Sequence, residues 1–395
     1  MVSNLPPKSP AAPPSAVKLS DERTAHAAVG AATAAVAIAG VGLSLSMTLL
    51  AVRLAQAGYS GRAIGFNAAA GGLATFASAP FVPGLARRLG VRALLILSLF
   101  AGAICLCGFA ALDGYWPWFA LRILFGAALT VLFATSEFWI SSAAAPKKRG
   151  LVMGLYTAAF AIGVAVGPIL LPLAGEGNTP FLIAIGLFLL AGVPVGIAGS
   201  HAPVLEAPAR RSILSLVAAM PAATCAALVY GAVETAGMGL LPVYALRSGF
   251  DPATGAFLVA IFALGNGVLQ TPIGIISDRV DRHRLLLFVA GSSTIGALLL
   301  PLARAAGLGA FASLLFLWGG IVGSLYALGL AQLGSRYEGA ELASGNAAYI
   351  ALYSAGMLAG PPLMGLGLDL APAGLFIALA ALLFAYFSLA LWRRS

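Results

Sequence analysis

Residues 274–284 read GIISDRVDRHR, and an apolar run of membrane-spanning length lies on either side of them. Charged side chains such as those of Asp278 and Arg279 are too costly to place in hydrocarbon. An irregular backbone is also excluded from lipid, because its polar groups find no hydrogen-bond partner there. The stretch is therefore predicted to form a short turn at a membrane surface, between two helices that cross the membrane.

The composition of the whole chain supports this interpretation. Of its 395 residues, 61% are hydrophobic and only 9% are charged, and the mean hydropathy is +0.99. Soluble domains carry about 25% charged residues, so we expect an all-α, polytopic membrane protein. At about 20 residues per span, the chain has room for a dozen helices joined by short loops.

The spans fall into two groups of six, separated by a charged linker at residues 201–212. Residues 1–26, rich in Pro, Ala and Ser, are predicted to form a disordered cytoplasmic tail. The first six-helix half then occupies residues 27–200, and the second occupies residues 213–392. Individual spans are expected near residues 27–53, 62–84, 91–112, 116–142, 149–173, 179–199, 213–246, 252–277, 284–303, 307–335, 341–367 and 372–392.

Basic residues predict the orientation. With the tail inside, the outer loops hold only Arg53, Arg62, Arg247 and Arg304, and Arg122 lies within a span. The other 17 of the 22 Lys and Arg residues then lie on the inner side. Because cytoplasmic loops are enriched in positive charge, we expect an inner-membrane protein with both termini in the cytoplasm. The net charge of +9 then needs no nucleic-acid partner.

The two halves resemble each other at a nearly constant offset. At an offset of 191, residues 47–52 (MTLLAV) fall on residues 238–243 (MGLLPV). At an offset of 193, residues 163–168 (GVAVGP) fall on residues 356–361 (GMLAGP), and Tyr156 falls on Tyr349. Transporters built from such repeats place the substrate site between the repeats, near the membrane midplane. We therefore predict two pseudo-symmetric six-helix halves.

The turn at residues 274–284 resembles the loop signature of the major facilitator superfamily of transporters, Gly-x-x-x-Asp-Arg-x-Gly-Arg-Arg. Gly274, Asp278, Arg279 and Arg282 match it, whereas Asp281 stands where the family has glycine. The resemblance implies a twelve-helix transporter in which this loop gates the cytoplasmic side.

The first-half counterpart of this loop is residues 80–92, PFVPGLARRLGVR. Arg88, Gly90 and Arg92 match the signature, but Arg87 replaces its aspartate. The expected gate in this half is therefore incomplete, and Glu137, at the inner end of the fourth span, is a candidate for the missing partner.

Arg122, in the sequence ALRILFG, resembles the arginine of the family's fourth-helix motif, Arg-x-x-x-Gly. That arginine is linked to proton coupling, and the resemblance implies the same role here. A guanidinium stays charged, so it must face a cavity or a partner, or else extend to the outer surface.

Both GVAVGP and GMLAGP contain glycines four residues apart, followed by proline. Such glycines let two helices approach closely, and proline weakens the backbone hydrogen bonding. In the family, this pattern on the fifth helix is typical of proton-driven exporters, which implies a gating role, with plain helix packing as the alternative. The residues concerned are Gly163, Gly167, Pro168, Gly356, Gly360 and Pro361.

Glu234, in the sequence YGAVETAG, is placed well inside the seventh span. A carboxyl group that is shielded from water binds a proton more readily, which suits a proton carrier. We therefore expect Glu234 to carry the proton, with Glu137 as the second candidate. The alternatives for Glu234 are a neutral hydrogen bond to a neighbouring helix and permanent pairing with an arginine.

Polar and aromatic residues that share helix faces are candidates to line a cavity. Asn and Gln in this position also serve as simple contacts between helices. An apolar, aromatic cavity with one acid suits a small apolar or amphipathic solute, including cations, whereas an arginine in the same cavity favours an organic anion. The predicted substrate-binding residues are Arg53, Tyr156, Phe160, Tyr230, Asn266, Gln270, Asn346, Tyr349 and Tyr353.

The sequence contains no phosphate-binding loop, metal-ligand cluster or Ser–His–Asp set, so we expect no cofactor, no metal and no enzymatic activity. It predicts a monomeric secondary transporter that exports a small apolar or amphipathic organic molecule in exchange for protons, by alternating access. A proton-coupled importer of an organic anion or nutrient is the alternative on the same fold. A membrane receptor or assembly factor that does not transport is the alternative of another class.

Overall fold

The computed structural model describes residues 15–143, 149–175, 177–197, 217, 219–277, 279–337 and 339–392. Within these ranges the chain is built from α-helices and one 3₁₀ turn, without a strand. In chain order the elements are α1 (Ser15–Gln56), α2 (Gly61–Ser78), η1 (Ala79–Phe81), α3 (Val82–Leu89), α4 (Val91–Ala111), α5 (Tyr115–Ala143), α6 (Arg149–Leu170), α7 (Thr179–Ile197), α9 (Pro221–Arg247), α10 (Pro252–Ser277), α11 (Arg282–Ala305), α12 (Leu308–Arg336), α13 (Gly339–Leu370) and α14 (Gly374–Trp392).

The predicted fold class is confirmed: the described residues include 12 helical segments that are long and apolar enough to cross a membrane. The largest differences are at helix ends. The second span continues through η1 and α3 to Leu89, and the seventh begins at Pro221, where proline at the first helical position costs no backbone hydrogen bond. Helix α1 begins at Ser15, inside the predicted tail. The linker at residues 201–212 lies outside the described residues.

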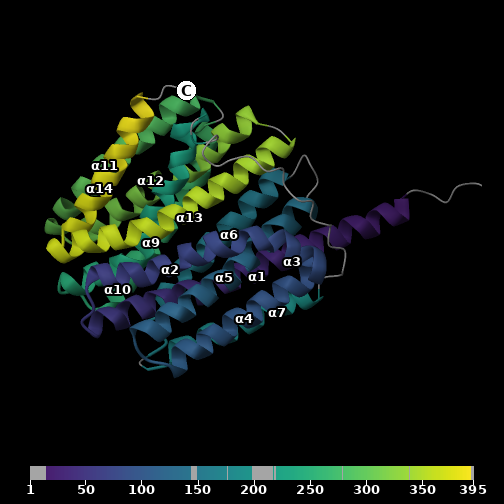
Figure 1. Cartoon of the computed structure of the whole chain (residues 1–395), viewed down its shortest axis with the longest axis horizontal. Coiled ribbons are helices and arrows are strands. Elements are labelled where there is room, and N and C mark those ends of the chain that lie inside the picture. Colours follow the sequence, from purple (N-terminus) through teal and green to yellow (C-terminus); the bar gives the residue numbers. More distant parts are fainter. Residues whose placement is uncertain are drawn as a thin grey trace, which may run out of the picture.

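The two groups of helices, α1–α7 and α9–α14, lie side by side (Figure 1). Equivalent glycines bring helices together in each group. A Cβ atom on Gly163 would collide with the Ala37 carbonyl oxygen, and one on Gly356 would collide with that of Leu228. The repeated glycines therefore pack α6 against α1 and α13 against α9. This packing is the alternative that we gave for both glycine motifs.

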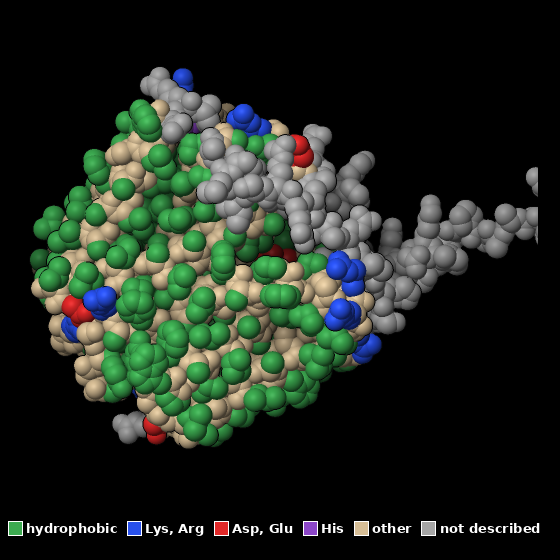
Figure 2. Space-filling model, in the orientation of Figure 1, with side chains coloured by type: hydrophobic (Ala, Val, Ile, Leu, Met, Phe, Trp, Pro, Cys, Tyr) green, Lys and Arg blue, Asp and Glu red, His purple; other side chains and the backbone are tan. Residues whose placement is uncertain are grey.

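The outside of the bundle is apolar. Figure 2 shows hydrophobic side chains over most of one face, with Lys and Arg gathered near its edges. Ile104 on α4 and Phe288 on α11 are 69% and 70% exposed, which is too much apolar surface for water. Such a surface fits the hydrocarbon of a bilayer.

The charged stretch that follows α10 is a turn, as predicted. Helix α10 ends at Ser277 and α11 begins at Arg282, and the backbone N–H of Arg284 donates to the Asp281 carboxylate at 2.7 Å. Asp281 therefore caps α11 in place of the family's glycine. Asp278 lies outside the described residues.

The bundle has an outer end and an inner end. The outer end holds the loops predicted to face out of the cell, and the inner end holds the turn between α10 and α11. At the outer end, Asp251 accepts a hydrogen bond from the Thr254 backbone N–H at 2.7 Å. Hydrogen bonds from Thr254 lower the pKa of the Asp251 carboxyl, because they stabilise its charged form.

Candidate transport site

Glu234 lies midway along α9, and its carboxylate is held by two tyrosines. The Tyr230 hydroxyl, one helical turn away, donates to Oε1 at 2.9 Å. The Tyr353 hydroxyl, from α13, donates to Oε2 at 2.5 Å. The side-chain N–H of Asn266, from α10, donates in turn to the Tyr230 hydroxyl at 2.5 Å. Four residues predicted as site residues thus meet in one hydrogen-bond network.

Tyr326, on α12, completes an aromatic wall beside this network. Its ring centroid lies 5.6 Å from those of both Tyr230 and Tyr353, and 5.0 Å from that of Tyr349. The Tyr349 hydroxyl donates to the Tyr326 carbonyl oxygen at 2.7 Å, which fixes the two rings relative to each other. Tyr326 was not among the predicted site residues, although an isolated tyrosine in an apolar span was a usable signal.

This network suits a group that binds and releases a proton or a cation. Each carboxylate oxygen of Glu234 accepts from a phenol, so the charged form is stabilised without an arginine. Glu234 as a residue is only partly buried. Among the described residues it forms no ion pair, which argues against the alternative of permanent pairing with an arginine.

Side chains of α5 and α6, in the first half, form a second group of aromatic and hydroxyl contacts. Phe133 of α5 and Phe160 of α6 meet edge to face with centroids 4.9 Å apart, and the Ser136 and Tyr156 hydroxyls lie 3.0 Å apart. Glu137 follows Ser136 on α5, and its side chain is exposed.

Glu137 and Glu234 both lie near Tyr326. Both carboxylates interact electrostatically with Tyr326, although they belong to different halves. Glu137 also interacts electrostatically with Tyr156 of α6. Figure 2 shows a hollow in the surface with an acidic side chain at its bottom. Among the described residues, no side chain forms an ion pair with Glu137 as a gate partner.

Two further amides lie near the Glu234 network. Gln270 is one turn from Asn266 on α10 and partly buried. Asn346 shares a face of α13 with Tyr349 and Tyr353. The side-chain oxygens of Asn266 and Asn346 are buried and have no hydrogen-bond donor among the described residues.

The structure does not bring Arg53 to this site. Its guanidinium, at the outer end of α1, donates to the Gly177 carbonyl and, at 3.3 Å, to the Asn178 side-chain oxygen. It also lies over the Phe181 ring, 5.0 Å from the centroid. These contacts join α1 to the loop before α7 within the first half. Sequence spacing alone could not separate this position from one facing the cavity.

Arg122 does not extend to the outer surface, which was the alternative to facing a cavity or a partner. Its side chain is 6% exposed. Tyr115 is the described group that interacts with it electrostatically, and neither Glu137 nor Glu234 does so. Arg122 is therefore buried apart from both candidate proton carriers.

At the outer end, Asp369 of α13 joins the two halves. Its carboxylate accepts from the backbone N–H groups of Gly61 and Arg62, at 2.6 and 2.9 Å, and pairs with Arg247 at 2.8 Å. Gly61 and Arg62 begin α2, and the N-terminus of a helix attracts an anion. We call Asp369, Arg247 and the start of α2 the outer latch.

The contact continues inward from the outer latch. A Cβ atom on Gly65 of α2 would collide with the Pro361 carbonyl oxygen of α13, and one on Gly72 would lie 2.7 Å from the Met357 Cβ atom. Pro361 therefore contacts the other half, whereas Gly356 and Gly360 contact α9 in their own half.

At the inner end, the predicted gating residues bond within their own halves. Arg92 donates to the Gly196 carbonyl oxygen, and Arg282 donates to that of Ala331 at 3.1 Å. Arg88 and Arg279 are exposed. The described polar contacts thus join the halves at the outer end, while these arginines bond within one half or face solvent.

Comparison with known proteins fits this architecture. The family model described as "Major Facilitator Superfamily" matches residues 32–223 and again residues 222–395. The chain belongs to the major facilitator superfamily. It is thus a multi-pass membrane transporter and not an enzyme, and the alternative of a receptor or assembly factor is set aside.

Similar proteins are transporters of the same type. The MFS-type transporter YfkF of Bacillus subtilis is 29% identical over 302 residues, covering 72% of this chain and 74% of that protein. YcaD of Escherichia coli O7:K1 is 24% identical over 305 residues, covering 76% and 78%.

Solved structures share the fold. A point mutant of the nucleoside transporter NupG superimposes with a TM-score of 0.76 at 14% identity, covering 94% of this chain and all of that one. A bacterial homologue of the human lysosomal transporter Spinster, in an inward-facing and occupied conformation, superimposes with a TM-score of 0.71 at 13% identity, covering 92% and 96%.

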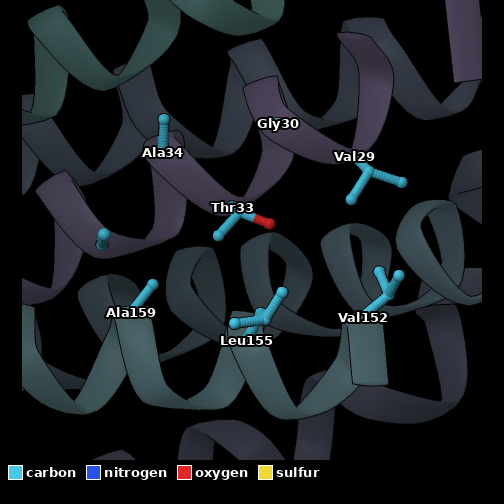
Figure 3. A pocket seen from close by; sticks show the side chains of 8 residues that line it. Val29, Gly30, Thr33, Ala34, Val152, Leu155 and Ala159 are labelled. Atoms are coloured by element: carbon cyan, nitrogen blue, oxygen red, sulfur yellow. The ribbon is translucent and has the colours of Figure 1, made fainter. Parts of the chain in front are cut away.

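A separate pocket of about 360 Å³ lies between α1 and α6 in this superfamily member. Figure 3 shows side chains of both helices, among them Thr33 and Leu155, pointing toward each other across it. The two helices are in close contact at Ala37 and Gly163, and Ala37 also lines the pocket. Its lining contains no acid or base, so it is distinct from the Glu234 network.

Proposed function

We propose that this transporter carries protons on Glu234 and exports a small apolar or amphipathic organic molecule by alternating access. The observation that carries the proposal is the Glu234 carboxylate itself, which accepts hydrogen bonds from Tyr230 and Tyr353 on a residue that is only partly buried. A charge at this depth is kept only where it has a use, because it is costly in a membrane.

The exchange follows from competition at one carboxylate. In the inward-facing state, the outer latch is closed, and Glu234 releases its proton to the cytoplasm and admits the substrate against the tyrosine rings. In the outward-facing state, the outer latch is open, and a proton from outside binds Glu234 and displaces the substrate. One proton enters for each substrate that leaves by this route.

Glu137 has a supporting role in this scheme. It faces the same space from the first half, so its charge attracts protons and cationic substrates toward the Glu234 network. Phe133, Phe160 and Tyr156 offer the apolar surface opposite the tyrosines. The transporter is proposed to act as a monomer in the inner membrane, with both termini in the cytoplasm.

The test uses purified protein in liposomes loaded with a pH-sensitive dye. An imposed proton gradient is challenged with tetraphenylphosphonium, a lipophilic cation, and with benzoate, an organic anion. Proton movement that needs the cation, and that Glu234→Gln reduces to the level of protein-free liposomes, supports the proposal. Unchanged movement in Glu234→Gln contradicts it, and Glu137→Gln is the matched variant expected to retain most of the flux.

The import of an organic anion is the second candidate, and one observation favours it. Arg122 is a buried cation without a described acidic partner. Benzoate, and not the cation, would then drive proton movement in the same assay.

A further inference from the structure

Arg122 has an uncommon environment for a buried charge. Its side chain is 6% exposed, and its Nε–H has no acceptor among the described residues. The described group that interacts with it electrostatically is the phenol of Tyr115, which is neutral near pH 7. A buried guanidinium stays charged, so it needs a negative partner.

The register between α2 and α5 shows what lies beside Arg122. The Thr130 hydroxyl donates to that of Thr75 at 3.0 Å. A Cβ atom on Gly126 would lie 3.1 Å from the Gly71 Cα atom. In both pairs the residue numbers differ by 55, as expected for two parallel helices in contact.

The same difference of 55 in residue number places Asn67 of α2 level with Arg122 of α5. Asn67 is 0% exposed, and neither its side-chain oxygen nor its side-chain nitrogen has a hydrogen-bond partner among the described residues. An unpaired buried amide is costly, and here it lies level with an unpaired buried cation. Two independent orphaned side chains therefore mark one position between α2 and α5.

We propose that a small monovalent anion, a halide or a carboxylate group, binds between Arg122 and Asn67. A single negative charge balances the single guanidinium charge, and the Arg122 Nε–H and the Asn67 amide N–H supply converging donors. The anion comes either from the surrounding medium or from the carboxylate of a transported molecule.

This site is separate from the proton site, and its test does not depend on the proposed function. Thermal unfolding of the purified transporter is measured at constant ionic strength in chloride, in acetate and in gluconate, whose bulk excludes it from the position. Saturating chloride is expected to raise the Tm of the wild type by about 3 °C or more over gluconate.

Asn67→Asp is the decisive variant, because its carboxylate supplies the missing charge within the chain. Its Tm in gluconate should reach that of the wild type in chloride, and it should no longer respond to chloride. Equal Tm values for the wild type in chloride and gluconate overturn the proposal. A chloride response that persists unchanged in Asn67→Asp overturns it as well.

Crystals grown in bromide keep the test decisive if Asn67→Asp fails to fold. An anomalous peak within hydrogen-bond distance of the Arg122 guanidinium supports the site, and its absence at saturating bromide contradicts it. Labelled acetate distinguishes the two sources: uptake into proteoliposomes that Asn67→Asp abolishes identifies a transported carboxylate. Stabilisation by acetate without uptake identifies a resident ion.

Discussion

The two halves of this transporter repeat one helical arrangement but hold their buried charges differently. In the second half, the Glu234 carboxylate accepts hydrogen bonds from two phenols, and Asn266 donates a hydrogen bond to one of these phenols. In the first half, Arg122 and Asn67 are more deeply buried and have orphaned polar atoms. A shared backbone therefore does not require a shared charge environment. The half with the hydrogen-bonded acid is suited to proton transfer, and the other is suited to holding an anion.

Removing one hydroxyl from the second half should show the largest effect on this contrast. Tyr353→Phe keeps the ring but removes the 2.5 Å hydrogen bond to Glu234. Hydrogen bonds to charged groups contribute about 1.5–3 kcal/mol, so we expect substrate-driven proton flux in liposomes to fall by at least about tenfold.

Tyr326→Phe is the matched control for Tyr353→Phe. Tyr326 lies against the same rings, but none of the hydrogen bonds described to Glu234 comes from it. The proton flux of Tyr326→Phe should stay within about twofold of the wild-type flux. Equal losses in the two variants would mean that ring packing, and not the hydrogen bond, supports Glu234.

A smaller effect is expected where the second half contacts the first. Asp369→Asn removes the charge that binds Arg247 and the start of α2. Because these side chains are partly exposed to solvent, the loss is about 1 kcal/mol, which shifts the conformational equilibrium about fivefold toward an open outer end. Spin labels at Ala57 and Ala371, which are exposed in loops of different halves, report this opening as a longer distance.

The control for the outer latch is Asp281→Asn. Asp281 also caps a helix, but α11 belongs to its own half. This variant should leave the distance between Ala57 and Ala371 unchanged. If Asp369→Asn also leaves it unchanged, the outer latch has no part in closing the outer end.

Much of the fold followed from the sequence because membrane spans obey a simple rule. Each apolar run of sufficient length must form a helix in lipid, so the spans and the turn after α10 were correct to within a few residues in most cases. The near-constant offset between the halves correctly paired Gly163 with Gly356, and each of them packs against another helix of its half.

The candidate site was only partly accessible from sequence. Tyr230 and Glu234 share a helix face, so their contact followed from spacing. The contact between Glu234 and Tyr353 depends on how α9 packs against α13, which no local pattern encodes. Asp369 lies at the end of a span, where no spacing predicts its contacts with the start of α2. The position of Asn67 beside Arg122 became visible only from the register between α2 and α5.

Proton release on binding tests the central claim most directly. Purified transporter in a weakly buffered detergent solution is mixed with saturating tetraphenylphosphonium at a series of pH values, and the pH change is recorded at each. If substrate and proton compete for Glu234, the wild type and Glu137→Gln release protons in proportion to the protein present, and Glu234→Gln binds the cation weakly and releases none. Release from Glu234→Gln equal to that of the wild type would contradict the account, because the proton would then reside on another group.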